Sequence, residues 1–142
     1  MSDVQAQIEL QDVLFRYGWG MDHDDWDLVT EAFHAAARAE YSDLGAHEGR
    51  EAIVEGLREP LKALDVIYHQ MTNHRAIVSG DTARVEAYVS TTCVRKGAPG
   101  GDMHLYGGAY DNDMVLTPTG WKIKTLRYQR LWEHGNTSLI AG

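Results

Sequence analysis

The 142-residue sequence has one cysteine, few basic residues and no long apolar run. The single cysteine, Cys93, excludes an intrachain disulfide and any zinc cluster built from several thiolates, and we expect it to be a small core residue. No stretch approaches the ~18 apolar residues of a membrane span, so no membrane partner is expected. With 13 basic and 21 acidic residues, the net charge of −8 would repel a phosphate backbone, which argues against nucleic acid as a partner.

Familiar site motifs are absent as well. The chain has no serine-hydrolase elbow, no H-E-x-x-H zinc motif, no phosphate-binding loop and no dinucleotide fingerprint. His69 and His74 fall on opposite faces of a predicted strand, which makes them a poor metal pair. We therefore expect no metal and no cofactor. The first residues lack the basic and apolar regions of a secretory signal, which predicts a cytoplasmic protein.

The length and the apolar pattern predict one α+β domain over residues 1–142. Helical spacing of apolar residues predicts a helix from residue 3 that ends near Gly18 and Gly20. Further helices are predicted from 24, with Asp24 as N-cap, and over 50–64 with an interruption at Pro60. Alternation then predicts a mostly antiparallel sheet. Its strands are expected at 37–42, 73–78, 83–90, 103–116 and 121–132. Residues 43–49 read as a loop. The apolar face of the last strand changes parity near Thr125, which predicts a bulge.

His69 and Asp22 are the two side chains most suited to chemistry. His69 follows the apolar residues 66–68, and histidine is the natural proton-transfer group near neutral pH. A hydrogen-bonded structural role is its alternative. Asp22 follows the buried stripe of the first helix, where a carboxylate must either cap a helix or pair with a cation.

Four segments carry a family resemblance. Residues 17–27 (YGWGMDHDDWD), 69–83 (HQMTNH, later GDTA), 107–112 (GGAYDN) and 120–123 (GWKI) resemble, in this order, motifs of SnoaL-like proteins in the NTF2-like superfamily. The resemblance covers nearly the whole chain. It implies a cone in which N-terminal helices pack on a strongly bent sheet.

Two groups in that superfamily, scytalone dehydratases and hexachlorocyclohexane dehydrochlorinases, use an Asp–His pair, and Asp22 and His69 match it. Tyr41 matches a tyrosine of the dehydratases. The resemblance thus implies a lyase or isomerase that takes a proton from carbon. His69 would be the general base, Asp22 would orient its ring, and Tyr41 would donate a hydrogen bond to a developing oxyanion or departing hydroxyl. Met21 replaces a dehydratase tyrosine, so the same substrate is not expected.

An apolar pocket for a small apolar or polycyclic molecule follows from the same comparison. Its candidate lining residues are Tyr17, Trp19, Tyr110, Leu126 and Tyr128, each of which could equally be a core residue. Arg127 and Arg130 could anchor an anionic substrate, or simply form ion pairs at the surface.

Two other interpretations remain open at this point. The domain could bind a small ligand or serve in assembly without catalysis, because fold does not fix function. A ketosteroid-isomerase-like enzyme would need a carboxylate base, for which Asp111 or Asp113 could serve. The expected outward sheet face and an exposed Trp132 region suggest a homodimer or homotrimer.

Overall fold

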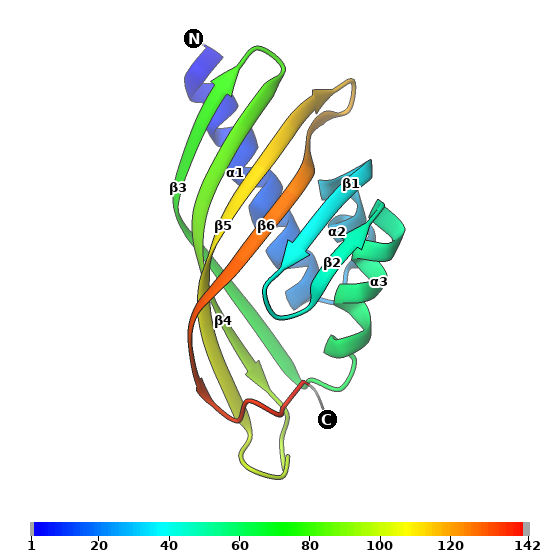
Figure 1. Cartoon of the computed structure of the whole chain (residues 1–142), viewed down its shortest axis with the longest axis vertical. Coiled ribbons are helices and arrows are strands. Elements are labelled where there is room, and N and C mark those ends of the chain that lie inside the picture. The colour runs from blue at the N-terminus through cyan, green and yellow to red at the C-terminus, as the bar shows by residue number, and fades with distance from the viewer. Residues whose placement is uncertain (1, 141–142) are drawn as a thin grey trace.

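The computed structural model describes residues 2–140, in which three helices pack on one six-stranded sheet (Figure 1). The helices are α1 (Ser2–Asp22), α2 (Trp26–Ala32) and α3 (Arg50–Leu61). The strands are β1 (Phe33–Tyr41), β2 (Gly45–Glu48), β3 (Val66–Ser79), β4 (Thr82–Val94), β5 (Met103–Thr117) and β6 (Gly120–Gly135). They lie in the order β2-β1-β6-β5-β4-β3, and only the β1–β6 pair is parallel. The predicted α+β class with a mostly antiparallel sheet is confirmed.

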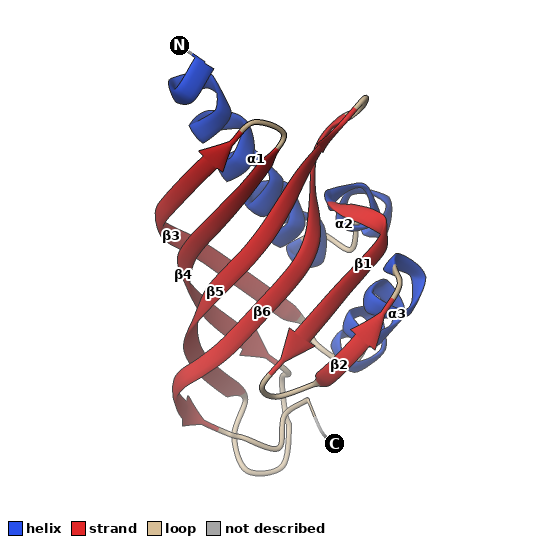
Figure 2. Ribbon diagram, turned by 45° about the horizontal axis from the view of Figure 1, so that its top comes forward, coloured by secondary structure: helices blue, strands red, loops and turns tan. Residues whose placement is uncertain are grey.

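All three helices lie on the same face of the sheet (Figure 2). The apolar stripe of α1 faces this sheet because its members recur at helical spacing. Those members are Leu10, Val13, Leu14, Tyr17 and Met21, and all of them are buried. Asp22, the last residue of α1, is thereby carried to the inner surface of the sheet.

The turn between α1 and α2 differs in one detail from the prediction. Asp25, not Asp24, caps α2, and its carboxylate accepts a hydrogen bond from the Leu28 N–H at 3.2 Å. Asp24 instead takes a positive φ of 58°, which reverses the chain directly after α1. This reversal allows α1 to end with Asp22 at the inner surface.

Bulges bend the long strands. The bulge predicted near Thr125 is confirmed, because Asp113 pairs with Thr125 while Met114 pairs with Ile123, which leaves Lys124 without a partner. A second register shift lies at Leu131 of β6, and a third lies in β3 at Asn73, whose φ is 57°. Each extra residue increases the local twist and curves the sheet around the helices.

Several boundaries differ from the sequence prediction. Helix α1 continues past Gly18 and Gly20 to Asp22, and β1 begins at Phe33 instead of residue 37. Helix α3 ends at Leu61, one residue after Pro60, because the proline ring cannot continue the backbone hydrogen bonds of a helix. Strand β2 occupies part of the predicted loop. Strand β3 begins at Val66, so His69 lies inside a strand and not before one.

Two other features concern the core and the membrane. Cys93 is buried in a small apolar cluster with Tyr106 and Leu139, as expected, and burial raises the pKa of its thiol to about 11. Within residues 2–140, no helix is both long and apolar enough to cross a bilayer.

Candidate functional site

A cavity of about 320 Å³ lies between the inner face of the sheet and the ends of the helices. Its size is at the lower end of the range for small-molecule sites. Aromatic, aliphatic and a few polar side chains form its wall, from α1, α3, five strands and the segment after β6. They are Tyr17, Met21, Tyr41, Asp43, Leu44, Leu57, Pro60, Leu61, Ile67, His69, Thr91, His104, Tyr106, Tyr110, Tyr128, Arg130, Thr137 and Ile140.

Asp22 and His69 meet at one side of this cavity. The ring Nδ1 of His69 lies 2.6 Å from Oδ1 of Asp22, and the His69 backbone N–H donates to both carboxylate oxygens at 3.1 and 3.0 Å. The two side chains are only 7% and 11% exposed. Because the carboxylate accepts the proton on Nδ1, the neutral ring keeps a free lone pair on Nε2. That atom makes no hydrogen bond within the described residues.

The close approach of α1 to β3 places the pair. Gly18 stands where the helix crosses the strand, and a Cβ there would lie 3.1 Å from Met71 Cε and 3.4 Å from His69 Cβ. A larger side chain would push the helix from the strand. Asp22, one turn further along α1, is consequently held against the His69 backbone.

Tyrosines surround the space next to His69. The hydroxyls of Tyr17 and Tyr41 lie 2.7 Å apart, and the Tyr110 ring packs between those of Tyr17 and Tyr128, at centroid distances of 6.1 and 5.3 Å. Burial, and next the neighbouring Tyr41, raise the pKa of Tyr17 well above its ordinary value. Burial and then Tyr110 do the same for Tyr41. Both hydroxyls therefore keep their protons at any physiological pH and can act as donors.

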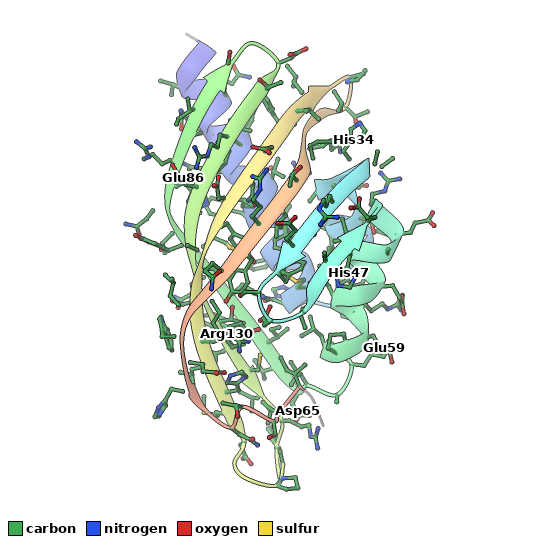
Figure 3. The ribbon with its side chains drawn as sticks, in the orientation of Figure 1. His34, His47, Glu59, Asp65, Glu86 and Arg130 are labelled. Atoms are coloured by element: carbon green, nitrogen blue, oxygen red, sulfur yellow. The ribbon has the colours of Figure 1, made fainter. Side chains whose placement is uncertain are left out.

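A second polar group lies in another part of the wall, near the start of β5 and the end of β6. Arg130, which Figure 3 labels on the lower half of the sheet, contacts Asp43 at 2.7 Å and Glu133 at 3.0 Å. Glu133 also lies 3.0 Å from Nε2 of His104. The Arg130 guanidinium stacks 4.6 Å above the Tyr106 ring. Burial would lower the pKa of Arg130, but Asp43 and Glu133 together raise it above its ordinary value.

The structure places six of the nine predicted site residues at the cavity: Asp22 and His69 as a hydrogen-bonded pair, and Tyr17, Tyr41, Tyr110 and Tyr128 in its wall. Asp22 itself stands just behind His69. The prediction that the other three line the cavity is wrong. Trp19 is 62% exposed and stacks on His23, because it lies on the far side of α1 from Tyr17. Leu126 packs in the core instead.

Arg127 points to the outer face of the sheet, where it pairs with Asp113 at 2.6 Å. On the same face Arg84 holds Asp111 through two hydrogen bonds of 2.8 and 2.9 Å, and this lowers the pKa of the Asp111 carboxyl. Neither aspartate lines the cavity. Asp111 and Asp113 therefore cannot serve as the carboxylate base of the ketosteroid-isomerase-like interpretation.

Sequence reasoning missed His104, Tyr106 and Glu133, and it left Arg130 undecided. The signal for the first two was present, because His104 and Tyr106 share the parity of Tyr110 on one strand. No group of three or more histidine, cysteine or acidic side chains in the part of the chain described here is arranged to hold a metal ion.

The sequence comparisons found one matching family model and several relatives. A family model described as the SnoaL-like domain matches residues 2–127. An uncharacterized protein of Mycobacterium tuberculosis is 30% identical over 127 residues, which is 87% of this chain and 84% of that protein. An uncharacterized protein of Mycobacterium bovis gives the same values.

Solved structures show the same fold. A Kribbella flavida protein superposes with a TM-score of 0.89 at 20% identity, over 99% of this chain and 100% of that one. A hexachlorocyclohexane dehydrochlorinase gives a TM-score of 0.83 at 18% identity, over 94% and 90%. An NTF2-like protein of Salmonella enterica gives 0.79 at 20% identity, over 94% and 96%. At these identities the likeness concerns the fold alone.

Proposed function

Because the chain belongs to the SnoaL-like domain family, we propose that it is a small-molecule lyase or isomerase in which His69 takes a proton from carbon. The observation that carries this proposal is the 2.6 Å contact between Asp22 and Nδ1 of His69, which leaves Nε2 free beside a largely apolar cavity. The dehydrochlorinase that shares the fold is named for an elimination, which supports the same reaction type here.

In the proposed step, Nε2 of His69 accepts a proton from a carbon next to a carbonyl or opposite a leaving group. The electron pair of the broken C–H bond forms a carbon–carbon double bond. In an elimination, the leaving group departs with its bonding pair; in an isomerisation, the imidazolium returns the proton to another carbon. Asp22 holds the tautomer and stabilises the imidazolium, and a positioned base of this kind contributes roughly 10²–10⁴-fold.

The tyrosine pair supplies the second requirement, a donor for developing negative charge. The hydroxyls of Tyr17 and Tyr41 share one hydrogen bond of 2.7 Å, so one hydroxyl proton stays available for a substrate oxygen or a departing hydroxyl. In a largely apolar cavity such a donor is worth more than in water, because water does not compete for it.

The test is a panel of hydroxylated, halogenated and keto compounds assayed with the parent protein, His69→Ala and a matched control. His134→Ala is the control, because His134 is an exposed histidine on β6 that does not line the cavity. We expect turnover in His69→Ala to fall at least ~10²-fold, with His134→Ala unchanged. Equal turnover in His69→Ala and the parent would reject His69 as the base.

Binding without catalysis is the second candidate, and the predominance of aromatic and aliphatic side chains in the wall favours it. In that case a ligand would bind parent and His69→Ala with similar affinity, and no compound of the panel would be turned over. The same two proteins therefore separate the two functions.

A further inference from the structure

We propose that His104, Tyr128 and Arg130, which line the cavity from β5 and β6, form a subsite for an uncharged hydroxyl group of the ligand. This inference deepens the proposed function, because it names a group that the substrate carries away from its reacting carbon. The case for it comes from unpaired buried atoms, from their arrangement and from the local charge.

Three polar atoms in this wall are buried without a partner in residues 2–140: Nδ1 of His104, the hydroxyl of Tyr128 and Nε of Arg130. All three residues line the cavity. The His104 side chain is only 3% exposed and the Tyr128 residue only 7%. A buried donor or acceptor that stays unpaired costs free energy, so three of them beside one cavity indicate that a ligand group completes their hydrogen bonds.

These groups gather around the ring of Tyr106. The centroid of the His104 ring lies 4.9 Å from that of Tyr106. The Arg130 guanidinium carbon lies 4.6 Å from the Tyr106 ring centroid, over the face of the ring, as in a cation–π contact. Burial raises the pKa of Tyr128 to about 12. The nearby Arg130 guanidinium acts in the opposite direction, which indicates that the two side chains are close together. The Tyr106 ring therefore packs against both His104 and Arg130 and holds them next to each other.

The charge of the subsite disfavours an anion. Arg130 already contacts two carboxylates, Asp43 at 2.7 Å and Glu133 at 3.0 Å. A carboxylate or phosphate ligand would face both of them in a cavity where water screens little. An uncharged oxygen brings no such repulsion, and it can still accept a hydrogen bond from Arg130 Nε–H.

The tautomer of His104 favours a hydroxyl over an ether or a carbonyl. Nε2 of His104 lies 3.0 Å from the Glu133 carboxylate, so Nε2 carries the proton and Nδ1 of the neutral ring is an acceptor. A hydroxyl group can accept from Arg130 or Tyr128 and donate to His104. An ether or ketone oxygen can only accept and would leave Nδ1 unpaired.

The spacing from the base fits one small ligand. Through Thr91 of β4, His69 is in register with Tyr106 of β5, which is about 10 Å across the sheet, and His104 lies two residues further along β5. Figure 2 shows that the sheet is bent around the helices, and side chains on the concave face of a bent sheet converge. A ring a few atoms long can therefore present a carbon to His69 and a hydroxyl to the subsite.

The experiment is calorimetric titration with three probes of the same shape: p-cresol, p-methylanisole and p-toluate. The parent is compared with Tyr128→Phe, which removes only the hydroxyl, and with Tyr88→Phe, the same change at an exposed tyrosine of β4. We expect p-cresol to bind the parent about tenfold more tightly than either other probe. Tyr128→Phe should weaken the binding of p-cresol and of p-methylanisole severalfold, because both oxygens can accept from the Tyr128 hydroxyl, and Tyr88→Phe should change nothing.

Four outcomes of these titrations would contradict the subsite. Preferential binding of p-toluate, no preference among the probes, no binding at all, or an affinity for p-cresol that is unchanged in Tyr128→Phe would each overturn the subsite. Titration of His69→Ala keeps this test separate from the proposed reaction. The p-cresol preference should persist in that variant whether or not His69 is the base.

Discussion

Replacing Asp22 with asparagine keeps the size of the side chain but changes what it offers to His69. The carboxylate accepts from the His69 backbone N–H at 3.1 and 3.0 Å and from ring Nδ1 at 2.6 Å. Asparagine retains one oxygen for the backbone N–H, but its amide nitrogen can only donate toward the ring. Nδ1 must then become the acceptor, which moves the ring proton to Nε2 and removes the free lone pair.

The size of the effect follows from these contacts. A hydrogen bond to a charged group contributes about 1.5–3 kcal/mol and a neutral one about 0.5–1.5 kcal/mol, so Asp22→Asn should destabilise the fold by about 1–2 kcal/mol. For a chain of this length that lowers the melting temperature by roughly 3–7 °C. Asp22→Ala leaves the buried backbone N–H of His69 with no acceptor and should cost more. The tautomer change in Asp22→Asn should lower proton abstraction by ~10⁴-fold.

Long-range proton–nitrogen NMR correlations of the histidine rings, recorded at a pH where the rings are neutral, report the tautomer directly. We expect His69 to carry its proton on Nδ1 in the parent and on Nε2 in Asp22→Asn, with the melting temperatures of both variants measured alongside. The reasoning is refuted if the asparagine variant keeps the proton on Nδ1, or if Asp22→Ala melts at the same temperature as Asp22→Asn.

Two further predictions concern stability. Gly20→Ala should lower the free energy of unfolding, measured in urea, by about 1–3 kcal/mol, because its Cβ would lie 2.8 Å from the Asp25 carbonyl oxygen. Gly18→Ala should lower it less, because the flexible Met71 methyl at 3.1 Å can move. Equal losses in the two variants would contradict this packing. In a Tyr68→Phe/Tyr88→Phe double variant, near-ultraviolet absorbance should show no tyrosinate until well above pH 10, because burial raises the pKa of the cavity tyrosines. Above about pH 10 the folded state keeps tyrosine protons that the unfolded state releases. The free energy of unfolding should therefore be constant below about pH 10 and fall as the pH rises beyond it. An absorbance titration with its midpoint at about pH 10 would contradict the raised pKa values.

Much of the site follows from periodicity that the sequence makes visible. The bulge near Thr125 turns Tyr128 inward, and by the same alternation it turns Arg130 inward and Arg127 outward. The sequence pattern could therefore have predicted that Arg130 faces the cavity and that Arg127 does not. Trp19 follows the same logic, because two helical steps rotate it about 200° from Tyr17 and onto the exposed side.

Other parts of the site depend on contacts that no local pattern reports. Gly18 and Gly20 resemble the end of a helix in the sequence, yet both remain inside α1 because β3 and α2 pack closely against them. The meeting of Asp22 with His69 was predicted from the family resemblance and not from spacing. Glu133 reaches His104 only after the shift at Leu131 resets the register of β6.

The parallel pairing of β1 with β6 has a consequence for how the chain folds. Tyr41 on β1 pairs with Tyr128 on β6, so a strand made early has no inner neighbour until the last strand has been synthesised. Contacts between such distant segments form slowly, because a long loop must close first. The nascent β1–β2 hairpin therefore has one unpaired edge during synthesis, and the part of the cavity wall that includes Tyr41 and Tyr128 is complete only after β6 pairs with β1.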